Sequence, residues 1–147
     1  MMIRPIVICV FRHNGRILVG EHVDPQKQET FYRPLGGGIE FGEHSREALA
    51  RELREELGAD VANLRYLAAL ENIFTFNGRP GHEIVQVYDG ELADKSLYEP
   101  LTLIGREDNG EPFTAVWKSL SDFMVENAPP LYPDGLLDLL HAKQPRL

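Results

Sequence analysis

The chain has little of several features that mark particular protein classes. It contains one cysteine, Cys9, which excludes an internal disulfide framework and a cysteine-based metal cluster, and we expect a reducing, cytoplasmic setting. No window approaches 18 consecutive apolar residues, so the sequence offers no membrane-spanning helix. Basic residues number 15 against 23 acidic ones, a formal net charge of −8. Such a chain attracts polyanions poorly, and we expect neither a nucleic-acid polymer nor a membrane as partner.

The composition that remains is that of one globular domain. The chain has 147 residues, of which 43% are apolar and 26% charged, and we expect a single domain over residues 1–147. β-Branched and alternating runs predict strands, with the clearest hairpin signal at Asn14-Gly15. The expected strands are residues 3–12, 16–20, 31–33, 73–76 (the end of a weakly alternating segment from 61), 83–92 and 113–118. Residues 21–30 and 94–112 are polar or mixed, which predicts loops.

Helical periodicity is clearest over residues 44–57. Ser45 is expected near its start and Gly58 to stop it. Two shorter helices are expected, one capped by Ser119 or Ser121 and one over residues 136–141. Strands mixed with two or three helices indicate the α/β or α+β class.

Three carboxylates share one arc of the expected helix. The core-facing arc consists of three leucines four residues apart, Leu49, Leu53 and Leu57. Glu52, Glu55 and Glu56 fall together on the adjacent arc, because residues three and four apart are neighbours on a helix surface. Like charges at this spacing cost about 0.2–0.5 kcal/mol per pair. A divalent cation such as Mg²⁺ takes oxygen ligands and would relieve that repulsion while leaving positions open for substrate phosphates.

The simpler interpretation is a solvated acidic face, which is what most Glu-rich helices present. Arg51 can pair with Glu47 and Glu55 one turn away on either side, which would also fix the orientation of the carboxylates. The run Gly36-Gly37-Gly38 just before the helix favours a binding site, because backbone without Cβ atoms can approach a phosphate or a metal closely.

Residues 37–59 read GGIEFGEHSREALARELREELGA, and this segment resembles the signature of the Nudix hydrolases. That signature is a glycine, five residues, a glutamate, seven residues, Arg-Glu, an aliphatic residue, any residue, Glu-Glu, any residue, a glycine and an aliphatic residue. Its seven fixed positions are Gly37, Glu43, Arg51, Glu52, Glu55, Glu56 and Gly58. A chance match is on the order of 10⁻⁸ per window. Ala59, where a larger aliphatic residue is usual, is the one soft departure.

The resemblance implies an α/β/α sandwich with a mixed, curved β-sheet. It also implies hydrolysis of a nucleoside diphosphate linked to another moiety, with Mg²⁺ or Mn²⁺ as cofactor. Carried over residue by residue, the implied metal ligands are Glu52, Glu55, Glu56 and the carbonyl of Gly36. Arg51 and Glu43 would orient them, and the expected contacts to substrate come from Arg33, Gly37, Gly38 and Glu43. Arg33 is included because an arginine three residues before the glycines suits bidentate phosphate binding.

The group that accepts the proton stays open. Some members of the family use a glutamate outside the signature, and the bacterial antimutator has one directly before a late-strand tryptophan, where this chain has Val116. Glu83, whose His-Glu pair resembles that of some sugar-nucleotide pyrophosphatases of the family, and Glu111 are candidates outside the signature. A solvated turn is the equal alternative for Glu83. Within the helix, Glu55 or Glu56 could serve.

The resemblance extends to the MutT-like and ADP-ribose pyrophosphatase-like branches and leaves the substrate open. A small nucleotide, such as the sugar nucleotide ADP-ribose, is the first expectation. The alternatives are a house-cleaning pyrophosphatase for (deoxy)nucleoside triphosphates, a dinucleoside polyphosphate hydrolase, and a catalytically silent domain that senses a nucleotide. Base and sugar are expected to contact residues 21–33, 76–82 and 94–112. Homodimers are frequent in the family, so a homodimer is an open expectation.

Overall fold

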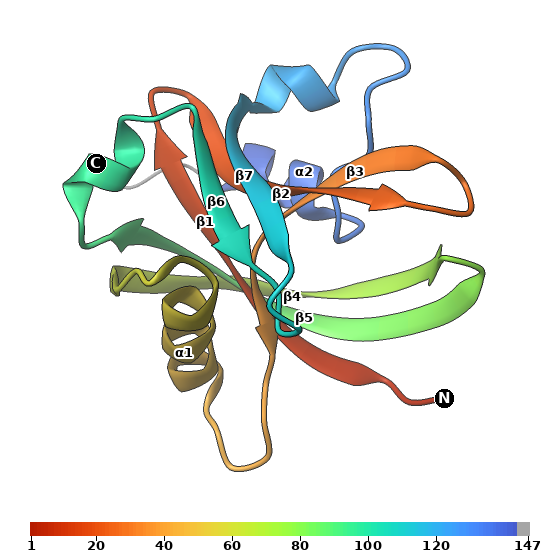
Figure 1. Ribbon diagram of the computed structural model, residues 1–147, viewed down its shortest axis with the longest axis horizontal. Coiled ribbons are helices and arrows are strands. Elements are labelled where there is room, and N and C mark those ends of the chain that lie inside the picture. Colours follow the sequence, from red (N-terminus) through yellow and green to blue (C-terminus); the bar gives the residue numbers. More distant parts are fainter. Residues whose placement is uncertain (144–147) are drawn as a thin grey trace.

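A computed structural model describes residues 1–143, and over that range it shows a seven-stranded mixed sheet with two α-helices (Figure 1). The strands are β1 (Arg4–His13), β2 (Arg16–Asp24), β3 (Glu29–Gly38), β4 (Val61–Phe76), β5 (Arg79–Leu92), β6 (Thr102–Arg106) and β7 (Pro112–Ser119). The helices are α1 (Ser45–Leu57) and α2 (Leu136–Ala142), with 3₁₀ turns η1 (Lys95–Tyr98) and η2 (Leu120–Phe123). This is the expected mixed α+β class. Neither helix is long and apolar enough to cross a membrane.

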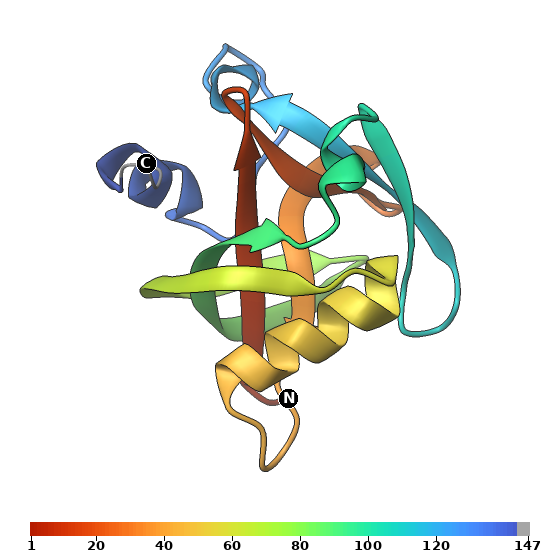
Figure 2. The ribbon, with the colours of Figure 1, turned by 90° about the vertical axis from the view of Figure 1, so that its left-hand side faces the viewer.

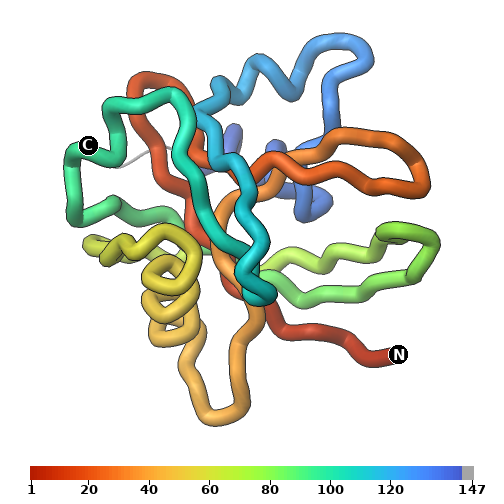
Figure 3. Tube along the Cα trace, in the orientation of Figure 1, coloured from red at the N-terminus to blue at the C-terminus, as the bar shows by residue number. Residues whose placement is uncertain are grey.

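The strand order is β4-β5-β1-β3-β2-β7-β6, and β1 pairs with β5 in parallel while its other pairings are antiparallel. β3 changes partner along its length: its first half pairs with β2 as far as Pro34, and its second half pairs with β1 from Leu35 onward. The two halves of the sheet therefore diverge around β3. In Figure 3 the β2–β3 and β4–β5 hairpins extend to the same side of the molecule, one from each half.

The two faces of β1 carry two separate hydrophobic clusters. Val7, Cys9 and Phe11 face α1, together with Leu49 and Leu53 of that helix. The alternate residues of β1, which are Ile6, Ile8 and Val10, belong to the second cluster. That cluster also includes two buried leucines of α2, Leu136 and Leu140. Side chains of a strand alternate between faces, so one strand supports both layers. Figure 2 shows the two helices on opposite sides of β1, which is the layered arrangement that was expected.

Local sequence signals correctly predicted the ends of several elements. Asn14 and Gly15 both have positive φ, 52° and 75°, as the hairpin turn between β1 and β2 requires. Helix α1 begins at Ser45 and ends at Gly58, which is left-handed with φ 64°. Cys9 is buried, and burial raises the pKa of its thiol well above the usual value.

The prediction of loops is wrong for two segments, residues 21–30 and 94–112. Residues 21–30 form the ends of β2 and β3 and their short turn, because Val23 and Asp24 pair with Thr30 and Glu29. Most residues of this paired hairpin are exposed and polar, and local composition does not distinguish such a hairpin from a loop. Likewise, residues 94–112 contain η1 and the edge strand β6. The strand expected over residues 31–33 also continues past Pro34 to Gly38.

Candidate active site

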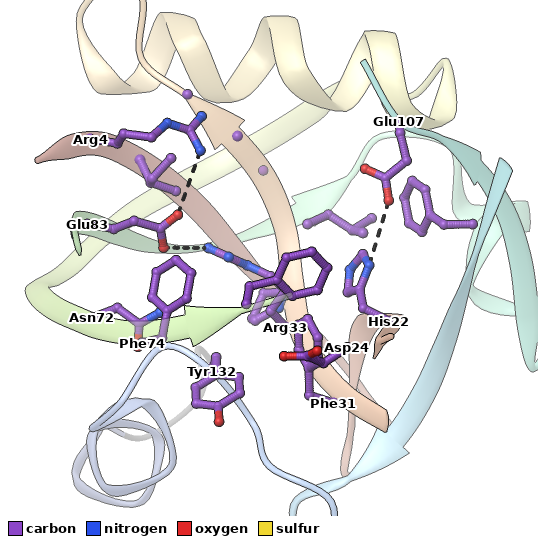
Figure 4. A pocket seen from close by; sticks show the side chains of 18 of the residues that line it. Arg4, His22, Asp24, Phe31, Arg33, Asn72, Phe74, Glu83, Glu107 and Tyr132 are labelled. Atoms are coloured by element: carbon purple, nitrogen blue, oxygen red, sulfur yellow. Dashed lines mark hydrogen bonds and ion pairs between the residues drawn. The ribbon is translucent and has the colours of Figure 1, made fainter. Parts of the chain in front are cut away.

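A cleft of about 720 Å³ opens between the two halves of the sheet and reaches the glycine end of β3 (Figure 4). We call the part beside α1 the acidic end; it is lined by Gly36, Gly37, Gly38, Glu52, Glu56, Glu107 and Asp108. The part farthest from α1 is the aromatic end; it is lined by Phe31, Phe74, Phe76 and Tyr132. The segment expected to bind phosphate and metal thus lies at one end of a cavity, with the aromatic groups at the other.

The glycines of β3 allow the carboxylates of α1 to reach the sheet. A Cβ atom at Gly37 would lie 2.5 Å from Glu52 Oε2, so only glycine leaves room for that carboxylate. At Gly36, φ is 151° and a Cβ atom would overlap the backbone of Val7. Gly38 differs, because the nearest atom to a Cβ there is Arg4 Nη2 at 3.5 Å, an ordinary contact. Glycine is therefore required at residues 36 and 37, where the backbone of Val7 and the carboxylate of Glu52 leave no room for a Cβ atom.

Glu56 is held against the glycine strand by a backbone donor. The amide N–H of Gly36 donates to Glu56 Oε1 at 3.1 Å. Burial, together with the nearby charge of Glu52, raises the pKa of Glu56 to about 9. Burial also raises the pKa of Glu52, which is 4% exposed. Without a cation, Glu56 therefore holds a proton at neutral pH. Neighbouring buried carboxylates cannot all ionise, because their negative charges repel one another.

Arg51 orients the carboxylates around it. Its Nε and Nη2 donate to the two oxygens of Glu43 at 2.8 and 2.9 Å, a bidentate pair that lowers the pKa of Glu43 to about 2. Its Nη1 donates to Glu52 at 3.0 Å and to Glu55 at 3.3 Å. Nη2 also donates to the carbonyl of Gly38 at 2.9 Å. One guanidinium thus connects the loop, the helix and the glycine strand.

Three carboxylates at the acidic end are close enough to share a cation. Oxygens of Glu52, Glu55 and Asp108 lie within 4.8 Å of one another. These are the hard oxygen donors that Mg²⁺ and Mn²⁺ prefer. The room that Gly37 leaves for Glu52 is a second feature that fits such a group. Two of the three expected side-chain ligands belong to this set, and the third, Glu56, lies on the same wall of the cleft.

Sequence reasoning missed Asp108 and its neighbour Glu107, which stand in the turn between β6 and β7. The only available signal was the Asp-Asn-Gly sequence at residues 108–110, typical of a tight turn. It indicates where a hairpin reverses but not that the turn lies beside α1. Glu111, expected as an alternative base in this region, is exposed and is outside the cleft lining described for residues 1–143.

His22 lies between the two ends of the cleft and was also missed. Its ring stacks on Phe31 at 5.4 Å and on Phe113 at 5.9 Å, and its Nδ1 is 3.6 Å from Glu107 Oε1. Burial, aided by the charge of Arg33, lowers the pKa of His22 to about 4. His22 is therefore neutral at pH 7 and contributes an aromatic face rather than a charge.

Glu83 and Arg33 form a buried ion pair in the middle of the cleft (Figure 4). Glu83 is 3% exposed, Arg33 Nη2 donates to its Oε1 at 3.3 Å, and Arg4 Nη1 lies 4.0 Å from its Oε2. The alternative of a solvated turn for Glu83 is wrong, because the residue belongs to β5 and pairs with Arg4 in the β1–β5 register. Arg33 lines the cleft, as its expected role in binding substrate requires.

The aromatic end is closed by contacts between two hairpin turns. Asp24, which is buried, accepts hydrogen bonds from the backbone amides of Gln26 and Lys27 within its own turn. Its other oxygen accepts from the amide of Asn77 at the tip of the β4–β5 hairpin, at 3.2 Å. Lys27 Nζ donates to the carbonyl of Thr75 at 2.9 Å. These bonds tie together the tips of the two hairpins that form the walls of the cleft.

Comparisons with known proteins agree with this geometry. A family model described as the NUDIX domain matches residues 2–135. Curated relatives include the NAD-capped RNA hydrolases NudC of Vibrio vulnificus, 29% identical over 90% of this chain, and of Vibrio cholerae, 30% identical over 90%. The chain spans less than half the length of both, 43% and 42% respectively.

Solved structures show the same fold. A MutT NUDIX hydrolase from Burkholderia pseudomallei superposes with a TM-score of 0.66 at 21% identity, covering 95% of this chain and 97% of that one. The ORF135 protein of E. coli gives a TM-score of 0.58 at 26% identity, covering 97% of this chain and 91% of that one. A protein described as an ADP compounds hydrolase gives 0.60 at 19% identity, covering 95% and 71%.

Proposed function

The chain belongs to the Nudix hydrolase family, and from that premise we propose that it uses Mg²⁺ or Mn²⁺ to cleave the pyrophosphate bond of a small nucleotide. The observation that carries the proposal is the acidic end of the cleft. There Glu52 and Glu56 line the cleft beside a glycine strand that is shaped around Glu52, and oxygens of Glu55 and Asp108 lie within 4.8 Å of Glu52. Because all three glutamates are present, a catalytically silent domain is the less favoured alternative.

The cation would be held by Glu52, Glu55 and Asp108, with Glu56 and the Gly36 backbone beside them. When bound, it would offset the charge of the phosphates and lower the pKa of a water that attacks phosphorus. Arg51 holds Glu52 and Glu55 close together through its Nη1 donors. No protein nucleophile is required, so the side chains bind, orient and accept protons.

The charge balance of the cleft explains why a cation is needed. Seven carboxylates line it: Asp24, Glu29, Glu52, Glu56, Glu83, Glu107 and Asp108. The cationic side chains in the same lining are Arg4, Lys27 and Arg33. A diphosphate brought into this field is repelled unless metal ions neutralise the acidic end, and Arg33 is then its best-placed protein contact.

The aromatic end supports a nucleoside as the rest of the substrate. Phe31 contacts Phe76 and Tyr132 at ring separations of 5.9 and 5.6 Å, and such faces suit stacking of a base. Asp24 joins the tips of the two hairpins and so closes this end of the cleft. A closed end favours a ligand that fits entirely within the cleft, such as ADP-ribose or a nucleoside triphosphate. One of the similar structures is described as an ADP compounds hydrolase, which agrees with this class.

Capped RNA is the second candidate substrate, because the curated relatives are described as NAD-capped RNA hydrolases. Two features weigh against it in this chain. Its net charge is −8, which disfavours an RNA body, and it matches less than half of those relatives. A free dinucleotide, by contrast, needs no contacts beyond the cleft.

The test is a hydrolysis panel with purified protein, Mg²⁺ or Mn²⁺, and products identified by mass. The panel covers ADP-ribose, other sugar nucleotides, NAD, dinucleoside polyphosphates, (d)NTPs and NAD-capped RNA. We expect release of a nucleoside monophosphate from one small-nucleotide class, lost with EDTA. Preferential cleavage of capped RNA would replace the small-nucleotide proposal, and metal-independent turnover would refute the mechanism. Light scattering of the same preparation measures whether the protein is a homodimer.

A further inference from the structure

Glu83 is a buried carboxylate in the cleft whose neighbours are arginines. Each of its oxygens faces a different one, Oε1 toward Arg33 and Oε2 toward Arg4. The three side chains come from β5, β3 and β1, so they meet only where β3 crosses from one half of the sheet to the other. A carboxylate that is 3% exposed is costly to bury unless it is paired, and here the pairing is with cations that line the cleft.

The contacts of Glu83 separate it from the metal-binding carboxylates. Among residues 1–143, the carboxylates whose oxygens lie within 4.8 Å of one another are Glu52, Glu55 and Asp108, without Glu83. A general base needs an oxygen directed at the proton that it removes. Both oxygens of Glu83 are instead directed at guanidinium groups. The geometry does not suit Glu83 as a ligand or as a base.

Arg33 occupies the space between the two ends of the cleft. On one side it donates to Glu83, and it shares the lining of the cleft with His22 and Glu107, whose side chains lie 3.6 Å apart. Glu107 is thus a second carboxylate in the same cleft that could pair with this guanidinium. A guanidinium has five N–H donors, and Glu83 accepts from one Nη2 at 3.3 Å, so others can reach a ligand in the cleft.

We infer that Glu83 is a positioning residue that holds the guanidinium of Arg33, supported by Arg4, toward the substrate diphosphate. This inference rests on the proposed function for the identity of the ligand. Glu83 keeps Arg33 away from Glu107 and over the middle of the cleft, where a diphosphate spans the acidic and aromatic ends. Arg4 lies over Gly38, so its charge also faces the glycine strand.

Glu83→Gln separates this role from catalysis. Loss of the charge releases Arg33, and we expect KM to rise about tenfold, as for one charge-assisted hydrogen bond, with kcat within about threefold of wild type. The Kd for Mn²⁺, measured by EPR, and the shape of the pH–rate profile should not change. A fall in kcat of about 10²–10⁴ with loss of one limb of the profile would identify a general base and overturn the inference. A weaker Mn²⁺ complex would identify a ligand and overturn it equally.

A double-mutant cycle tests whether Glu83 acts through Arg33. Arg33→Lys should raise KM at least as much as Glu83→Gln, and the double variant should be no worse than Arg33→Lys alone. Additive effects would show that Glu83 acts independently of Arg33 and would overturn the inference. Asp89→Asn is the matched control, because Asp89 is another buried carboxylate of β5 and pairs with Arg65 of β4 at 2.7 Å, outside this cleft. Its KM should equal that of wild type.

A binding experiment makes the result independent of turnover. Imidodiphosphate, a non-hydrolysable diphosphate, is titrated into the Mn²⁺-loaded protein by calorimetry. We expect Glu83→Gln and Arg33→Lys each to weaken its binding about tenfold. Equal affinity in wild type and Glu83→Gln, or no binding to wild type, would overturn the inference. If the hydrolysis panel is silent while these variants weaken binding, the proposed hydrolysis fails but the positioning role stands.

Discussion

The two ends of the cleft are built in opposite ways. The acidic end comes mostly from one continuous segment, residues 36–56, in which a glycine strand and a helix bring like charges together. The aromatic end comes from residues far apart in the chain, such as Phe31, Phe76 and Tyr132, whose rings contact one another. The like charges of the first end repel one another, and the proposed cation would relieve that repulsion. The second is satisfied by its own packing and by the hydrogen bonds of Asp24.

This difference indicates a division of work. Under the proposed function, the acidic end would supply chemistry that depends only on the diphosphate, so a short motif can encode it. The aromatic end would supply contacts to the nucleoside, which depend on where separate hairpins meet. Substitutions at the two ends should therefore change different quantities, and four experiments test that separation.

The largest effect is expected at the acidic end. Glu56→Gln should lower kcat by about 10²–10⁴ and weaken Mn²⁺ binding. It should not destabilise the metal-free protein. The pKa of Glu56 is raised from an ordinary 4.5 to about 9 in the folded protein. The folded state therefore binds this proton more tightly than the unfolded chain, and the free energy of unfolding falls as pH rises between those values. Glutamine does not titrate, so the variant does not lose stability in this way. Urea unfolding in EDTA at pH 8.5 should therefore show the variant at least as stable as wild type.

Glu71→Gln is the control for that experiment, because Glu71 is exposed on β4 and lies outside the cleft lining. It should leave kcat, Mn²⁺ affinity and stability unchanged. Near-normal turnover by Glu56→Gln would remove the acidic end from the mechanism.

His22, at the junction of the two ends, predicts a pH effect on stability. Its pKa is lowered from 6.5 to about 4, so the unfolded chain binds the proton more tightly and folding loses stability as pH falls through that window. Between pH 7 and pH 4.5 the free energy of unfolding should fall by about 2 kcal/mol through this residue, about 30-fold in the equilibrium. The measurement is urea unfolding of wild type and His22→Gln at both pH values. Identical pH dependence of the two proteins would contradict the assignment.

Gly37 and Gly38 offer a matched pair within the acidic end. A Cβ atom at residue 37 meets the carboxylate of Glu52, whereas one at residue 38 makes an ordinary contact with Arg4. Gly37→Ala should therefore weaken Mn²⁺ binding about tenfold or more, with a similar loss of turnover. Gly38→Ala should change the Mn²⁺ Kd by less than about threefold. Equal behaviour of the two variants would show that room for Glu52 does not limit the site.

The smallest effect is expected at the aromatic end. Phe76→Ala should raise KM about five- to tenfold, corresponding to one lost stacking contact, and leave the Mn²⁺ Kd unchanged. Tyr66→Ala, which removes a half-exposed aromatic ring from the same strand but outside the cleft, is the control. A changed Mn²⁺ affinity in Phe76→Ala would break the separation between the two ends.

The same division explains what the sequence could predict. The part of the acidic end that comes from residues 36–58 could be proposed from the sequence, because helical spacing and glycine geometry are local properties of that segment. Gly58 ends the helix as expected, and Arg51 contacts Glu55 as helical spacing predicted, whereas its bidentate contact with Glu43 was not predicted. Asp108 could not be predicted, because its place beside α1 depends on how β6 pairs with β7.

The contacts at the centre of the cleft could not be predicted from the sequence for a related reason. Arg4 and Glu83 meet through the parallel β1–β5 pairing, which joins residues almost 80 positions apart and has no local signature. The polar segment at residues 21–30 was expected to be a loop, although Asp24 there anchors the aromatic end. Pairing of distant strands decides these contacts, and periodicity within one strand does not report its partner.

Hydrolysis in ¹⁸O-labelled water tests the central claim most directly. The protein would be given the best substrate of the panel, with Mg²⁺ and with EDTA, beside Glu56→Gln. The account predicts a nucleoside monophosphate and a second phosphorylated product, with one ¹⁸O atom in only one of them, formed by wild type with metal and not in the other two reactions. Labelled products formed at the wild-type rate in EDTA or by Glu56→Gln would contradict it.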